Sequence, residues 1–228
     1  MTRQQINYEV VRHLILKDWY LNRWVILGSL PVGLGALALV LTGKQIAFML
    51  CIILLCMVIV GAGAHLAMVT TINERKEQTL PFIMSLPVSW REYTAAKILA
   101  NLIIFLIPWL LLTVGALGVL LLPGATHGLL PYTAIMAVEM LVTTTLIVVA
   151  GIITESQAWT TAGIFASSLG INILGYIFAH LPGISKYMWG TRVHWSSTAW
   201  IVLGCELLTV PLLLGVTFYV QSRKTDFL

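Results

Sequence analysis

Six apolar runs, each long enough for a helix to cross a bilayer, dominate this sequence. A transmembrane helix needs roughly 20 consecutive, mainly apolar residues. The runs cover residues 24–41, 46–72, 98–122, 132–153, 158–177 and 198–220. Only 10% of the 228 residues are charged, whereas a soluble domain carries about 25% charged residues. The sequence therefore predicts an all-α polytopic membrane protein, folded as a single transmembrane domain over residues 1–228.

The segment before the first apolar run is polar but has a helical pattern of apolar residues. Four apolar residues recur at helical spacing: Val11, Leu14, Ile15 and Trp19. The basic residues of the segment lie mostly on other faces of this helix. This pattern favours an N-terminal amphipathic helix that lies in the membrane interface. The alternative is a simple cytoplasmic extension of the first span, and the sequence leaves both interpretations open.

The basic residues predict the orientation of the chain. If the N-terminus is inside, the inner segments carry ten Lys and Arg residues and the outer segments carry three. Because cytoplasmic loops are enriched in Lys and Arg, both termini are expected in the cytoplasm, with the spans in a bacterial cytoplasmic membrane. The net charge of +4 comes from residues at the ends of apolar runs, so it indicates contact with membrane lipid and not with nucleic acid.

The outer segment before the last run, residues 178–197, is irregular and rich in aromatic residues. It contains Pro182, Gly183 and Gly190, which interrupt helices. Aromatic side chains favour the level of the lipid headgroups. Two interpretations stand, a plain loop and short helices that re-enter the membrane, where non-helical backbone needs a protein cover.

The longest polar stretch inside the chain lies between the second and third runs. Residues 79–86 favour a short helix, because Thr79 is a good N-cap and Pro81 suits the first helical turn. Three apolar residues would then share one face of this helix: Leu80, Ile83 and Leu86.

The same stretch carries a second helix start. Pro87 ends the short helix, and Ser89 and Glu92 have the spacing of a capping box that begins the third span. A short helix held at the membrane surface by two long ones suits docking onto a soluble partner. A solvated loop with ordinary caps is the other interpretation.

Ten residues of this stretch resemble, in type and order, a motif of the ABC-2 type transporter permeases: Glu74, Glu77, Thr79, Leu80, Ser85, Leu86, Pro87, Val88, Ser89 and Lys97. The motif occupies residues 73–97. The layout of six spans, the interfacial N-terminal helix and the cytoplasmic termini extend the resemblance over the whole chain.

The resemblance implies the permease subunit of an ABC exporter, driven by a separate ATPase subunit that binds ATP and Mg²⁺. It implies a cytoplasmic coupling helix between spans 2 and 3, re-entrant outer helices between spans 5 and 6, and a second permease chain, identical or different, around a central path. The residues it assigns to contact with the ATPase are Glu74, Glu77, Thr79, Leu80, Ile83, Leu86, Pro87, Val88, Ser89 and Glu92.

Sequence motifs for catalysis are absent. There is no G-x-x-x-x-G-K-[ST] loop for nucleotide phosphates, no H-E-x-x-H metal motif and no G-x-S-x-G nucleophile motif. The three cysteines have no metal-ligand spacing. We therefore expect no enzyme activity, cofactor or metal site in this chain.

Three ionisable residues fall inside apolar runs: His65, Glu139 and Glu206. Ionisable groups at membrane depth are costly and are often functional. Glu139 and Glu206 are expected at similar depth, where they would line a translocation path, pair with hydroxyl groups or be protonated and structural. His65 lies near Gly61 and Gly63, which permit close helix contact, so a packed, hydrogen-bonded histidine is expected.

Other functions stay open at this level. A secondary carrier or channel is the main alternative to an ABC permease, although no inverted repeat is evident. An intramembrane enzyme is disfavoured by the missing motifs, and a structural or sensory membrane subunit also fits the composition.

Overall fold

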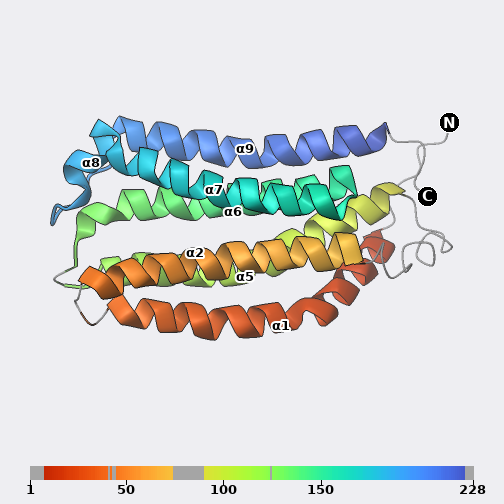
Figure 1. The fold of residues 1–228 in the computed structure, drawn as a ribbon, viewed down its shortest axis with the longest axis horizontal. Coiled ribbons are helices and arrows are strands. Elements are labelled where there is room, and N and C mark those ends of the chain that lie inside the picture. Colours follow the sequence, from red (N-terminus) through yellow and green to blue (C-terminus); the bar gives the residue numbers. More distant parts are fainter. Residues whose placement is uncertain (1–7, 41, 43–44, 74–89, 124, 224–228) are drawn as a thin grey trace.

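The computed structural model describes residues 8–40, 42, 45–73, 90–123 and 125–223, and these residues form a bundle of long helices (Figure 1). Within these ranges no strand is present. In chain order the helices are α1 (Tyr8–Val40), α2 (Gln45–Ala67), the π-helix η1 (Met68–Asn73), α5 (Trp90–Leu120), the 3-10 helix η2 (His127–Leu129), α6 (Leu130–Thr154), α7 (Gln157–His180), α8 (Pro182–Met188) and α9 (Ser197–Ser222).

Six of the helices, α1, α2, α5, α6, α7 and α9, are long and apolar enough to cross a membrane. They cover most of each of the six predicted runs. The prediction of a helical fold with six helices long and apolar enough to span a membrane is therefore confirmed for the described residues. A short helix, α8, lies in the predicted irregular segment, at the end of the bundle (Figure 1).

Two helices begin earlier than the apolar runs predict. The segment for which the sequence left open an interfacial helix or an extension of the first span is continuous with that span, because α1 is one helix from Tyr8 to Val40. Helix α5 begins at Trp90, eight residues before the third run and directly after Ser89, where the capping-box spacing of Ser89 and Glu92 predicts its start. The reason is tertiary: α1 and α5 pack along each other, and polar side chains of these early turns, such as Asp18 and Lys97, are buried between them.

Several helix ends lie together at one end of the bundle. The beginning of α1, the end of α9 and the two helix ends that flank residues 74–89 lie together there (Figure 1). The opposite end holds α8 and the connection from α5 to α6. This even-numbered, up-and-down arrangement agrees with both chain termini lying on the same side of a membrane.

Exposed aromatic side chains mark two levels along the outer helices. On α7, Trp159 and Tyr176 are exposed and lie about 26 Å apart at 1.5 Å per residue. On α9, Trp200 and Tyr219 are exposed and lie about 28 Å apart by the same rise. Since Trp and Tyr favour membrane interfaces, and the hydrocarbon layer is about 30 Å thick, these pairs fit the two borders of one bilayer.

Helix α6 is the centre of the bundle. It packs against α2, α5, α7 and α9, and 72% of its most apolar window is buried, compared with 11% for α7 and for α9. Helix α1 packs against α2 and α5 on one side of the molecule, and α7 and α9 pack against α6 on the other. The outer faces of α7 and α9 are apolar and exposed, as expected for faces that contact lipid.

The close approach of α2 to α6 depends on one glycine. A Cβ atom at Gly63 would lie 2.5 Å from Cγ2 of Thr144 and 2.7 Å from its Oγ1, whereas a Cβ atom at Gly61 would meet nothing within 4 Å. Small residues allow helices to pack closely in membranes. Gly63 therefore sets the distance between α2 and α6.

We predict that Gly63→Ala lowers the thermal stability of the purified protein, because overpacking of a tight contact costs about 1–3 kcal/mol. The matched control, Gly61→Ala, is expected to leave the melting temperature unchanged or slightly higher. Adding Thr144→Ala to Gly63→Ala should recover part of the loss. Equal melting temperatures for Gly63→Ala and Gly61→Ala would contradict this account of the packing.

We also predict that single cysteines at Glu9 and Arg223, in a variant without the native thiols, react alike with a membrane-impermeant maleimide. Both positions belong to the helix ends that gather at one end of the bundle. A cysteine at Arg192, beyond α8 at the opposite end, should show the reverse accessibility. The measurement is labelling of intact and of permeabilised cells, and different labelling of Glu9 and Arg223 would refute the arrangement.

Candidate functional site

The predicted contact segment for an ATPase falls almost entirely outside the described residues. Residues 74–89 contain all of the assigned contact residues except Glu92. Glu92 lies in the first turn of α5, is 6% exposed and interacts within the chain. Its side chain is therefore directed into the protein.

The two helix ends that flank this segment are joined by buried polar contacts. Lys97 Nζ on α5 donates to Asp18 Oδ2 on α1 at 2.8 Å, and both side chains are 3% exposed. A second cation, Lys17, lies 3.4 Å from Asp18 Oδ1, but its side chain is 37% exposed. A buried charge is tolerated only with a close partner, so Asp18 and Lys97 require each other.

A neutral contact continues the same connection to η1. Asn101 Nδ2 on α5 donates to Thr70 Oγ1 at 2.8 Å and to the Lys97 carbonyl oxygen at 2.8 Å. Thr70 Oγ1 in turn donates to the Leu66 carbonyl oxygen at 2.7 Å. Both residues are 1% exposed. Thus η1, which directly precedes residues 74–89, is fixed to α5, which directly follows them.

We call these four residues, Asp18, Thr70, Lys97 and Asn101, the polar joint. It connects α1, η1 and α5 at the end of the bundle where the contact segment begins and ends. The π-helical geometry of η1 agrees with a functional site at this end of the bundle, since π-helical turns often occur at functional sites.

Sequence analysis did not find most of the polar joint. Lys97 belonged to the motif, but Asp18, Thr70 and Asn101 had no assigned role. Asp18 carries a detectable signal, because it lies three residues after Ile15 and seven after Val11, on the apolar face of the helical pattern. Thr70 and Asn101 carry no such signal, since a hydroxyl or amide in an apolar helix can bond to the carbonyl one turn earlier.

The structure brings Glu139 and Glu206 together. Glu139 on α6 and Glu206 on α9 are 4% and 7% exposed, and their carboxyl groups are close enough to interact. Thr143 Oγ1 donates to Glu139 Oε1 at 3.3 Å. Neither carboxyl oxygen of Glu206 makes a hydrogen bond of acceptable distance and angle. The two acids predicted at similar depth are therefore neighbours, between the central helix and an outer one.

His65 is placed differently from the prediction. Its neighbours Ala62 and Gly63 are buried, but His65 itself is exposed on the outer face of α2. The expectation of a packed histidine was wrong, because Gly63 and not His65 occupies the contact with α6. Because His65 follows Gly63 by two residues, it lies on a different face of α2, and its imidazole points away from the bundle.

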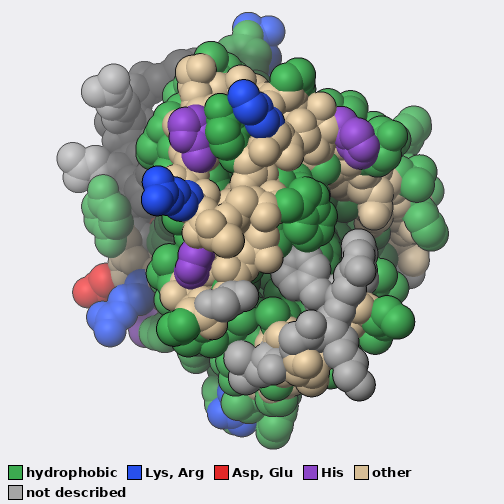
Figure 2. Space-filling view, turned by 90° about the vertical axis from the view of Figure 1, so that its left-hand side faces the viewer, with side chains coloured by type: hydrophobic (Ala, Val, Ile, Leu, Met, Phe, Trp, Pro, Cys, Tyr) green, Lys and Arg blue, Asp and Glu red, His purple; other side chains and the backbone are tan. Residues whose placement is uncertain are grey.

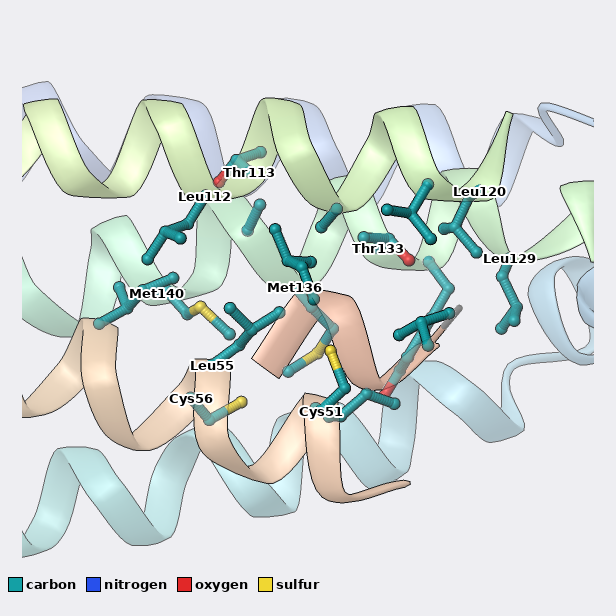
Figure 3. Close-up of a pocket in the computed structure, with 18 residues that line it drawn as sticks. Cys51, Leu55, Cys56, Leu112, Thr113, Leu120, Leu129, Thr133, Met136 and Met140 are labelled. Carbon is teal, nitrogen blue, oxygen red and sulfur yellow. The ribbon is translucent and has the colours of Figure 1, made fainter. Parts of the chain in front are cut away.

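A cavity of about 110 Å³ lies between α2, α5 and α6 (Figure 3). In Figure 3, Cys51 and Leu55 on α2 approach Met136 and Met140 on α6 across this space. The wall is almost entirely apolar. Its polar side chains are Thr113, Tyr132 and Thr133, and the hydroxyl of Tyr132 already donates to the Gly175 carbonyl oxygen at 3.2 Å. The cavity suits an apolar group, and neither Glu139 nor Glu206 lines it.

The end of the bundle that holds α8 carries a mixture of side-chain types. Figure 2 shows the end of the bundle that holds α8, with scattered basic and histidine side chains among hydrophobic ones. Among the residues that the structure describes, no group of three His, Cys, Asp or Glu side chains is placed to hold a metal ion.

Comparisons with protein-family models, with curated proteins and with solved structures find no match for this chain.

We predict that Asp18→Asn or Lys97→Met destabilises the protein by roughly 3–5 kcal/mol, the usual cost of leaving one member of a buried ion pair alone. The matched control is Lys17→Met, which removes a half-exposed partner of the same aspartate and should cost at most about 1 kcal/mol. Thermal unfolding in detergent measures the difference. The double variant Asp18→Leu/Lys97→Met should recover much of the loss, and equal effects of Lys17→Met and Lys97→Met would contradict the assignment.

Proposed function

We propose that this chain is the permease subunit of an ABC transporter, an exporter powered by a separate ATPase subunit that binds ATP and Mg²⁺. Six helices of membrane-spanning length and composition support a transport role. The resemblance of residues 73–97 to the ABC-2 permease motif supports the class of transporter. On this proposal both termini are cytoplasmic, and a second permease chain completes the translocation path.

The observation that carries the proposal is the polar joint around the contact segment. Residues 74–89 enter from η1 and leave into α5, and the joint fixes these two elements to each other and to α1. A displacement applied to the segment would therefore move α1, α5 and the end of α2 together. A rigid attachment of this kind is what a docking segment needs to convert ATPase movement into movement of helices.

The carboxyl pair supports a different mode of transport as the second candidate. Carriers that use an ion gradient place acidic residues inside the membrane, and Glu139 and Glu206 are both buried in the bundle. In this alternative, a secondary carrier, no ATPase takes part. The two candidates differ in one measurable respect, which is whether an ATPase subunit binds to residues 74–89.

We predict that the protein, purified from its native host in mild detergent, brings an ATPase subunit with it. The test variant is Leu86→Asp, which places a charge on the apolar face of the proposed coupling helix. The recovery of ATPase should fall about tenfold or more, since loss of a central apolar contact costs about 2 kcal/mol or more. Glu92 is left unchanged, because it is buried and its replacement would disturb α5.

The matched control for this experiment is Arg192→Asp, a charge change on an exposed residue at the opposite end of the bundle. It should retain the ATPase at the wild-type level. If no ATPase is recovered with the wild type even after cross-linking, the ABC proposal fails. Transport into vesicles driven by an ion gradient without ATP would then establish the secondary carrier.

A further inference from the structure

Glu139 and Glu206 are buried on the packed helices α6 and α9, and both oxygens of Glu206 lack a hydrogen-bond partner. Glu139 lies nine residues after the start of α6, and Glu206 nine residues after the start of α9, at about 14 Å along each helix by the rise of 1.5 Å per residue. The hydrocarbon layer is about 30 Å thick, so both groups lie close to its centre. Water cannot be expected to solvate them there.

Charged partners for the pair are not found among the described residues. On the helices packed against α6, the described His and Lys side chains are exposed or paired elsewhere. His65 on α2 is exposed, and Lys97 on α5 is paired with Asp18. His180 is the last residue of α7, and Lys186 lies in α8. Both are exposed, and so is His194 in the segment that follows α8. Within the described part of the chain, Thr143 Oγ1 donates a hydrogen bond to Glu139 Oε1.

A negative charge on both groups is therefore unfavourable. Each buried carboxylate without a counter-charge costs several kcal/mol, and two adjacent carboxylates also repel each other. A metal ion is a poor remedy, because hard cations take about six or more oxygen ligands. The pair offers four carboxyl oxygens and one threonine hydroxyl, since the backbone carbonyls of α6 and α9 are used within the helices. A proton, in contrast, can be bound by the two carboxyl groups alone.

We propose that Glu139 and Glu206 form a proton-binding site inside the membrane, which holds α9 against α6. A proton bound between the carboxyl groups removes one negative charge and lets one acid donate a hydrogen bond to the other. This site does not depend on an ATPase, so it goes beyond the proposed transport function and stands or falls independently of it.

The attachment of α9 explains why this site has a structural consequence. Among the described residues, α9 has four buried side chains, Ala199, Glu206, Thr217 and Gln221, and three of them are polar. Gln221 Nε2 donates to the Ile152 carbonyl oxygen of α6 at 2.6 Å, which fixes one end of α9. Glu206 is the polar contact near its middle. When both acids are ionised, their repulsion is expected to loosen the middle of α9 from α6.

The test is infrared spectroscopy of the full-length protein in lipid nanodiscs, in the carbonyl-stretch region of protonated carboxylic acids, as a function of pH. The wild type should show a protonated-acid band at neutral pH that disappears at alkaline pH. Glu139→Gln/Glu206→Gln should lose this band, and each single variant should shift or lose it. The control Glu9→Gln, on the exposed first turn of α1, should keep the wild-type band.

Thermal unfolding of the same samples provides the second measurement. The melting temperature of the wild type should fall as the pH rises through the loss of the band, and the double glutamine variant should lack this fall. A band that is absent from the wild type, or retained in the double variant, overturns the proposal. A second outcome also overturns it. If the melting temperature of the wild type differs between Na⁺ and choline at fixed pH and that of the double variant does not, a metal cation occupies the site.

Discussion

The buried ion pair between Asp18 and Lys97 is the contact on which the organisation of one end of the bundle depends, the end that flanks residues 74–89. A charge removed from water is tolerated only beside an opposite charge, so the pair fixes the mutual position of α1 and α5. It also explains why both helices begin well before their apolar runs. The early turns of each are stabilised by the other, with their polar side chains turned inward.

The connection from Lys97 to η1 extends this fixed position to the segment between α2 and α5. Asn101 bonds to Thr70 across the helices, and each of the two also bonds to its own helix. Three elements are thereby joined at one end, whereas α7 and α9 pack mainly against α6, with small contacts of α7 to η1 and of α9 to α5. The bundle thus has a firmly joined group of helices next to the contact segment and a second group attached through the central helix.

Among the residues that the structure describes, the buried polar side chains between α6 and α9 include two acids and no base. Glu139 and Glu206 are like charges and cannot satisfy each other as Asp18 and Lys97 do. A bound proton, as proposed above, would relieve their repulsion, and the pair lies where α9 has few other buried side chains. The apolar cavity is separate from this pair and lies between α2, α5 and α6 (Figure 3). Two independent features, one acidic and one apolar, therefore occupy the two sides of α6.

The sequence by itself determined the number and the approximate limits of the long helices, because the length and apolar character of each run are local properties. It also predicted that Glu139 and Glu206 lie at similar depth, since depth follows from position along a helix. Which side chains face inward was decided only by the tertiary structure. His65 was expected in a contact that Gly63 makes, and Asp18 was overlooked although its partner Lys97 was noticed. The rotation of each helix and the choice of its contacts depend on residues far apart in the chain, such as Asp18 and Lys97. When nearly every face of a helix is apolar, hydrophobic periodicity does not specify which face turns inward.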